Sequence, residues 1–81
     1  MELDQSVFDR VAGVIADHFQ HRKPITPETT AVQVHGWDSL AHTIVIMKVE
    51  DEFGVELPEP VIFGLRNVGD LALAIQAQVI A

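Results

Sequence analysis

The amino-acid sequence predicts an all-α fold, a bundle of three main helices and a short third helix, with a long loop between the first two helices. Three observations lead to this prediction. Apolar residues recur at helical spacing in three separate stretches. Each stretch follows a side chain that suits a helix N-cap. No stretch alternates apolar and polar residues long enough to form a paired strand, and residues 54–57, which come nearest, are too few to pair alone.

The first helix is expected to begin after Asp4 or Ser6 and to extend to about Gln20. Gly13 lies inside it, where glycine costs about 1 kcal/mol relative to alanine, and its small size leaves room for another helix to approach. Pro24 ends this segment. The predicted buried face consists of Phe8, Val11, Ala12, Ile15 and Phe19, with Val7 and Val14 beside it.

A long loop then extends to Trp37, with one predicted helical turn that has Thr26 as its cap and Pro27 at its first position. A loop of this length needs a packing or functional reason. Gly36 is expected to supply a backbone angle that other residues resist. We expect some of the loop's apolar side chains to pin it over the helix ends; they are Ile25, Val32, Val34 and Trp37.

The second helix is expected to begin after Asp38, whose carboxylate can accept from the N–H of Leu40 or Ala41, and to end near Phe53. Ser39 then occupies the first helical position. Its hydroxyl points outward beside unpaired backbone N–H groups and the positive end of the helix dipole. This place suits a serine that carries a phosphate. Trp37 either shields this junction or forms a wall for a group bound next to Ser39.

The second helix carries two apolar stripes. The core-facing stripe consists of His42, Val45, Ile46, Val49 and Phe53. The second stripe consists of Leu40, Ile44 and Met47. Periodicity leaves two interpretations open, because the second stripe is either a docking surface or further core.

The helix ends in the acidic run at residues 50–52, where the macrodipole disfavours anions by roughly 0.3–1 kcal/mol. A Lys48–Glu52 pair at i, i+4 would offset a few tenths of this. The run is either a solvated face or a surface for a basic partner.

After Gly54, Val55 and Leu57 are expected to return to the core, and residues 59–63 to form the short third helix with Pro60 near its start. Its apolar residues Val61, Ile62 and Phe63 are expected in the core. Asn67 is expected to cap the last helix, with Asp70 completing a capping box. The inner face of the last helix consists of Val68, Leu71, Ala72, Ile75 and Val79.

The 81 residues are expected to form one domain, residues 1–81. The absence of cysteine excludes disulfides, thiolate metal sites and a thiol of the chain's own. A net charge of −7 argues against binding to nucleic acid and to anionic membranes, and it favours a monomer with basic protein partners. No apolar run approaches the ~20 residues of a membrane span. The acidic N-terminus lacks the pattern of a signal peptide, so we expect a cytoplasmic protein.

Motifs of enzymes are weak in this chain. The hydrolase pattern Gly-x-Ser-x-Gly is absent, and Asp38, Ser39 and His42 lie too close along one helix to form a relay in the required order. His18 and His21 share a helix face but lack further ligands at metal-site spacing. We therefore expect no catalytic activity and no metal.

Four motifs follow one another along the chain: Gly-Trp-Asp-Ser-Leu at 36–40, Ala-His at 41–42, Val-Glu-Asp-Glu-Phe-Gly-Val-Glu-Leu-Pro at 49–58, and Asn-Val-Gly-Asp-Leu at 67–71. With these motifs the chain resembles an acyl carrier protein. The similarity covers the whole domain, from the first helix to the last. Asp-Ser-Leu alone is a weak motif. Its place at the midpoint of a small acidic helical chain, with Glu-x-Glu-Phe-Gly at 50–54, makes it specific.

The resemblance implies that Ser39 receives 4′-phosphopantetheine from coenzyme A through a separate Mg²⁺-dependent phosphopantetheinyl transferase. The thiol of this arm would carry acyl groups as thioesters to acyltransferase, ligase and ketosynthase-type enzymes. The resemblance also implies that the second helix is the recognition helix, and it favours docking for the second stripe. The implied docking residues are Asp38, Leu40, Ile44, Met47, Glu50 and Asp51.

Four features differ from the common family pattern: His35, Ile44, Lys48 and the apolar segment 58–63 with its extra proline. They favour a stand-alone carrier of a polyketide or other specialised pathway over the general fatty-acid carrier. The alternative is a peptidyl or aminoacyl carrier of a nonribosomal pathway, although Trp37 interrupts the Gly-Gly-x-Ser run usual there. A helical adaptor without a prosthetic group is the third hypothesis.

Overall fold

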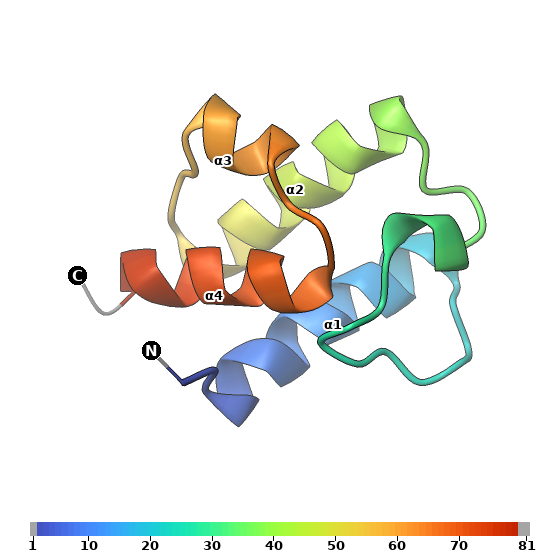
Figure 1. Ribbon diagram of the computed structural model, residues 1–81, viewed down its shortest axis with the longest axis horizontal. Helices are drawn as coiled ribbons and strands as arrows, with labels where there is room; N and C mark the ends of the chain where they lie inside the picture. The colour runs from blue at the N-terminus through green and yellow to red at the C-terminus, as the bar shows by residue number, and fades with distance from the viewer. Residues whose placement is uncertain (1, 80–81) are drawn as a thin grey trace.

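The computed structural model describes residues 2–79, which form helices joined by loops, with no strand among them. The elements are α1 (Gln5–Phe19), the 3₁₀ helix η1 (Ala31–Gln33), α2 (Ser39–Phe53), α3 (Glu59–Phe63) and α4 (Val68–Val79). Figure 1 shows α1, α2 and α4 packed together, with the short α3 above α4 and the long α1–α2 loop at one end. The all-α prediction, with a short third helix, is confirmed.

The core lies where α1, α2 and α4 meet, and it is built from the predicted helix faces. Its buried residues are Phe8, Val11, Ile15, Val45, Ile46, Val49, Leu57, Val68, Leu71, Ala72 and Ile75. Burial of each large side chain contributes roughly 1.5–3 kcal/mol, so these faces account for most of the packing energy. Three residues predicted in the core are exposed instead. Val79 is about half exposed at the end of α4, and Val61 and Phe63 are 37% and 70% exposed on α3, because this helix is too short to turn all of its apolar residues inward.

The helix ends follow the predicted capping residues. Asp4 caps α1, where its carboxylate accepts from the N–H groups of Ser6 and Val7. These bonds lower the pKa of Asp4, the side-chain hydrogen bond from Ser6 most. Gly54 ends α2 in the left-handed conformation at φ 67°, which glycine adopts without strain. Gly13 makes no close approach, because nothing lies within 4 Å of a methyl group placed on it.

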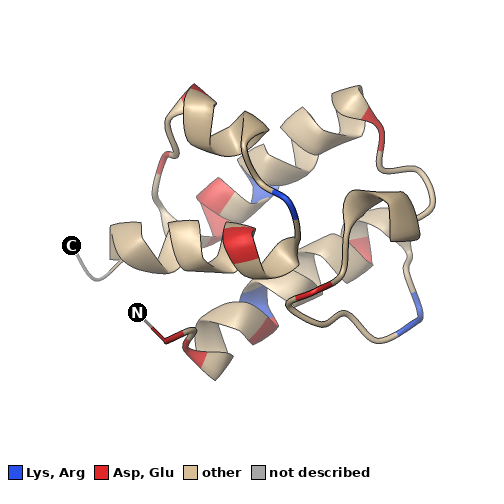
Figure 2. Cartoon of the chain, in the orientation of Figure 1, with Lys and Arg blue, Asp and Glu red and all other residues tan. Residues whose placement is uncertain are grey.

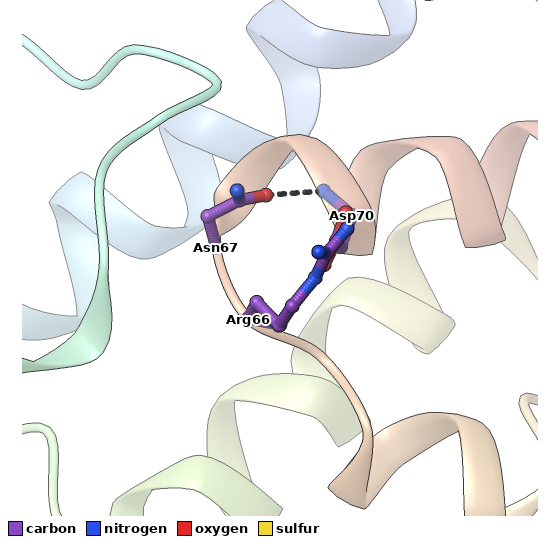
Figure 3. A network of polar contacts seen from close by, with 3 residues as sticks. All are labelled: Arg66, Asn67 and Asp70. Carbon is purple, nitrogen blue, oxygen red and sulfur yellow. Dashed lines mark hydrogen bonds and ion pairs between the residues drawn. The ribbon is translucent and has the colours of Figure 1, made fainter.

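The start of α4 is held by two overlapping side-chain contacts (Figure 3). The side-chain oxygen of Asn67 accepts from the N–H of Asp70 at 2.8 Å, as predicted. The carboxylate of Asp70 accepts from the backbone N–H and guanidinium of Arg66, at 3.0 and 2.9 Å, and not from Asn67. The hydrogen bond from the Arg66 side chain is the main cause of a lowered pKa at Asp70. The predicted capping box is therefore only half formed.

The α1–α2 loop is anchored on α4 by backbone hydrogen bonds. The N–H of Val68 donates to the carbonyl of Thr29 at 2.9 Å, and that of Gly69 to the carbonyl of Pro27 at 2.8 Å. These bonds satisfy N–H groups that have no partner within a helix. The predicted helical turn near Thr26 is a simple turn, and the helical segment of the loop is η1. Val34 is buried, but Val32 is 95% exposed and does not pin the loop.

Candidate functional site

Ser39 is the first residue of α2 and is exposed. Asp38 precedes it in an extended conformation, and its carboxylate accepts from the N–H of Ala41 at 2.8 Å. Gly36 has a φ of 90°, as expected, which lets the loop turn sharply into the helix. The hydroxyl therefore lies in solvent at the positive end of α2, beside N–H groups that suit a phosphate.

Asp38→Ala is expected to lower the free energy of unfolding by about 0.5–2 kcal/mol, because the N–H of Ala41 loses its acceptor. Chemical denaturation of both proteins measures this difference. Asp38→Asn is the control, because asparagine caps helices nearly as well as aspartate. If Asp38→Ala and the wild type unfold at the same denaturant concentration, the cap contributes nothing in solution.

His42 lies at the edge of the core and links three segments. The indole N–H of Trp37 donates to its Nδ1 at 3.0 Å, and its Nε2 lies 2.9 Å from the carbonyl oxygen of Ile62 in α3. Because an indole N–H can only donate, Nδ1 accepts and Nε2 carries the proton that is donated to Ile62. The sequence placed His42 on the core face but did not predict this link, because nothing local indicates that α3 lies opposite.

Trp37 and His42 belong to a row of neighbouring aromatic rings near Ser39. Trp37 stacks on Phe19 with ring centroids 5.1 Å apart, and on His42 at 6.0 Å. The ring of Phe63 lies 6.3 Å beyond His42. Trp37 therefore covers the end of α1, and it also lines a hollow next to Ser39.

The hollow is open to solvent and has a volume of about 370 Å³. Its lining residues are Ala31, Trp37, Asp38, Ser39, His42, Phe63 and Leu65. A much smaller cavity of about 30 Å³ adjoins it, because the two spaces share Ala31, Trp37, His42 and Leu65 among their lining residues. An exposed hydroxyl, adjacent N–H donors and an open hollow together fit a flexible phosphate-linked group on Ser39.

The second stripe of α2 is exposed and is not part of the core. Leu40 is 72% exposed, Ile44 39% and Met47 57%. The opposite side of α2 packs on α1 and α4, so no described segment covers this stripe completely. Met47 also lines a small groove of about 130 Å³ between α2 and α3.

Two of the three carboxylates in the acidic run at the end of α2 bind groups of this chain. The carboxylate of Glu50 accepts from the N–H of Leu57 at 2.6 Å. Glu52 pairs with Arg10 of α1 at 3.1 Å, so the predicted Lys48–Glu52 pair is wrong. Arg10 also donates to the carbonyl oxygen of Glu52 at 2.9 Å. Asp51 remains exposed. Figure 2 shows acidic positions spread over the helices and loops and not gathered on one face.

Comparison with known families decides what this site belongs to. A family model described as "Phosphopantetheine attachment site" matches residues 9–75, which include the loop, α2 and α3. The chain belongs to the acyl carrier protein family. Acyl carrier proteins of Helicobacter pylori and Lactobacillus acidophilus are 35% and 32% identical to it, over 88% and 83% of this chain and 92% and 85% of their own. The meromycolate extension acyl carrier protein of Mycobacterium leprae is 40% identical over 64% of this chain and 45% of its own length.

Acyl carrier proteins are carriers and not catalysts, and their phosphopantetheine-binding domain carries the group covalently. They work with phosphopantetheinyl transferases and with enzymes that process acyl groups. The relatives are acyl carriers by name, so the nonribosomal alternative is not favoured. Among the described residues, no helix of this acyl carrier protein is long and apolar enough to cross a membrane.

Proposed function

We propose that Ser39 bears 4′-phosphopantetheine, whose thiol holds acyl intermediates as thioesters for partner enzymes. The observation that carries this proposal is the exposed Ser39 hydroxyl at the start of α2, within the segment that matches the attachment-site family. The group supplies the thiol that a chain without cysteine lacks. The chain supplies the nucleophilic oxygen and N–H donors for the phosphate. Residues 1–81 act as one carrier domain.

The test of this function is co-expression with a broad-range phosphopantetheinyl transferase, followed by intact-mass measurement. The expected result is one added phosphopantetheine, located by peptide mapping on Ser39. A protein that stays unmodified while a known carrier in the same cells is loaded contradicts the proposal.

The exposed stripe of α2 supports the proposed docking face for these enzymes. Leu40, Ile44 and Met47 form its apolar centre, and Asp38 and Asp51 lie exposed at its two ends. Glu50 is expected on the same face. It contributes to docking by holding the α2–α3 connection in place, because its carboxylate accepts from the N–H of Leu57.

Met47→Glu is expected to lower the kcat/KM of phosphopantetheinyl transfer about tenfold, the scale of one interface residue worth more than 1 kcal/mol. Since Met47 is exposed, the free energy of unfolding should change by no more than about 0.5 kcal/mol. The control is Val79→Glu, which places the same charge on an exposed apolar residue of α4. A large loss of stability in Met47→Glu, or equal transfer by both variants, contradicts the docking assignment.

The proposed pathway is polyketide or related specialised biosynthesis, with the protein acting as a cytoplasmic monomer. The apolar stripe with Ile44 and the exposed apolar surface of α3 support this choice over a general fatty-acid carrier. Loading assays compare an acyltransferase of a polyketide pathway with an amino-acid-adenylating enzyme. Transfer of an amino acid without transfer of an acyl unit would instead support the nonribosomal alternative.

A further inference from the structure

We infer that the phosphopantetheinyl transferase that loads Ser39 places a carboxylate opposite Lys48 and apolar side chains against the exposed stripe of α2. Lys48 is then a specificity-determining residue of the docking face. This inference rests on the proposed attachment at Ser39 and on the proposed docking face. It adds the chemistry of the partner's surface, which is acidic at one point and not basic throughout.

The carboxylates at the end of α2 add little charge to this face. The carboxylate of Glu50 accepts from the N–H of Leu57 at 2.6 Å, and Glu50 is half-buried. The carboxylate of Glu52 lies 3.1 Å from the guanidinium of Arg10. The carbon of the same guanidinium lies 4.2 Å from the centre of the Phe53 ring, so two contacts hold Arg10 at this corner. One carboxylate of the acidic run is therefore left for a partner.

Lys48 is the one lysine or arginine of α2, and its ammonium is not neutralised within the described chain. It is exposed, and no carboxylate of residues 2–79 forms an ion pair with it. Glu52 lies four residues further along the helix, where a carboxylate can pair with a lysine, but Arg10 binds this carboxylate instead. The contact between α1 and α2 thus leaves Lys48 available to another molecule.

Lys48 lies beside the apolar stripe. Residues four apart on a helix are neighbours on its surface, so Lys48 lies next to Ile44. By the same spacing, Asp51 lies next to Met47. Lys48 and Asp51, both within the described chain, are neighbours as well, yet they form no ion pair with each other. The stripe therefore ends in a cation and an anion side by side, and charges in a fixed order set the register of a contact.

The transferase has to reach Ser39, and Lys48 lies within its reach from there. Lys48 follows Ser39 by nine residues, which is about 13.5 Å along the helix axis. A standard interface buries about 800 Å² on each partner and extends beyond this length. An enzyme seated over Ser39 therefore covers the stripe and contacts Lys48 in the same complex.

The exposed side chains specify the chemistry of that enzyme's surface. Burial of the stripe favours apolar side chains on the partner, because both surfaces then leave water. The alkyl stem of Lys48 can pack along Ile44 while its ammonium stays at the edge of the contact. A carboxylate attracts this ammonium, whereas a lysine or arginine repels it. A partner built for a row of carboxylates would place a cation against Lys48, so the face discriminates against it.

The first experiment measures the kcat/KM of phosphopantetheine transfer by the transferase of the protein's own host. Lys48→Glu is expected to lower it about tenfold, because an attraction becomes a repulsion. Lys48→Gln removes the charge alone and should lower it about two- to fivefold, the scale of one exposed ion pair. Lys48→Arg keeps the charge and should stay within about twofold of wild type. Unchanged or faster transfer to Lys48→Glu overturns the inference, because the facing surface is then not acidic.

The matched control is Lys23→Glu, which makes the same change in net charge at an exposed lysine of the α1–α2 loop. Lys23 shares a hollow with Thr29 and Gln33 of the same loop. This variant should be loaded like wild type, because the inferred contact is local and does not depend on net charge. Equal losses in Lys23→Glu and Lys48→Glu overturn the inference, since they report long-range attraction alone.

The second experiment searches for the partner's carboxylate by charge reversal. Each acidic residue at the rim of the transferase's active site is replaced by lysine, one at a time. One of these variants is expected to restore the loading of Lys48→Glu to within about threefold of the wild-type pair, and to load the wild-type carrier more slowly. If no variant restores the loading of Lys48→Glu, no carboxylate faces Lys48 and the inference is wrong.

Intact mass and circular dichroism separate this inference from the proposed attachment. A folded wild type that is not loaded overturns both, whereas equal loading of every variant overturns the inference about Lys48 alone. If Lys48→Glu does not fold, Lys48→Gln decides the matter, because it adds no carboxylate four residues before Glu52. Unchanged loading of Lys48→Gln would then refute the contact.

Discussion

Ser39→Ala is expected to abolish loading by a phosphopantetheinyl transferase completely while leaving the fold intact. The side-chain oxygen is the nucleophile in the proposed attachment, and no neighbouring residue supplies a substitute at the same place. Asp38 is adjacent, but its carboxylate is bonded to the N–H of Ala41. Because Ser39 is exposed at the first helical position, alanine should change the free energy of unfolding by less than about 0.5 kcal/mol.

Intact mass and thermal unfolding are measured on the same preparations, so that loading and folding are judged together. Thr43→Ala is the matched control, because it removes another exposed hydroxyl from α2 outside the Ser39 hollow. Thr43→Ala should be loaded like wild type. An added mass that persists in Ser39→Ala places the attachment elsewhere. If Ser39→Ala lost both loading and folding, the lost loading could not be assigned to the missing hydroxyl. Circular dichroism of the variant detects this case.

The helices could be predicted from the sequence because their signals are local. Asp4, Asp38 and Asn67 accept from N–H groups two or three residues away, and Gly54 turns the chain at the end of α2. Such signals do not depend on the rest of the fold. The position of Ser39 at the tip of α2 follows directly from the cap before it.

Contacts between distant segments could not be predicted in this way. Glu52 pairs with Arg10 and not with Lys48 on its own helix, because packing of α1 on α2 brings the guanidinium to the carboxylate and carbonyl. His42 bonds to Ile62 because α3 lies beside the start of α2. The spacing of residues along one helix does not indicate which side chain of another helix contacts them.

The two stripes of α2 illustrate the same limit. Their spacing is helical in both cases, and only the placement of α1 and α4 decides which is buried. Val45, Ile46 and Val49 face these helices, whereas Leu40 and Met47 remain in solvent. The apolar character of Val61, Ile62 and Phe63 predicts all three in the core, yet α3 is too short to turn all of them inward, and Val61 and Phe63 are exposed. The exposed residues that result are those on which the proposed functions depend.

Gly69→Ala is expected to destabilise the fold by about 2 kcal/mol or more, although alanine is the better helix former by up to ~1 kcal/mol. A methyl group on Gly69 would lie 2.8 Å from the carbonyl oxygen of Pro27 and 2.9 Å from its Cβ. The loop would have to move away from α4. This movement would strain or break the hydrogen bonds from Gly69 to Pro27 and from Val68 to Thr29, at about 1 kcal/mol each. Overpacking of this kind adds roughly 1–3 kcal/mol.

Gly13→Ala is the matched control, because it makes the same change in a helix where nothing lies within 4 Å of the new methyl group. Here the propensity gain acts alone, and stability should rise by roughly 0.5–1 kcal/mol. For a domain of this size, 1 kcal/mol corresponds to about 4–8 °C in Tm. Calorimetry should therefore show the two variants moving in opposite directions from wild type. If Gly69→Ala also melts higher, the loop moves away from α4 without cost, and its hydrogen bonds to α4 do not contribute to stability as argued.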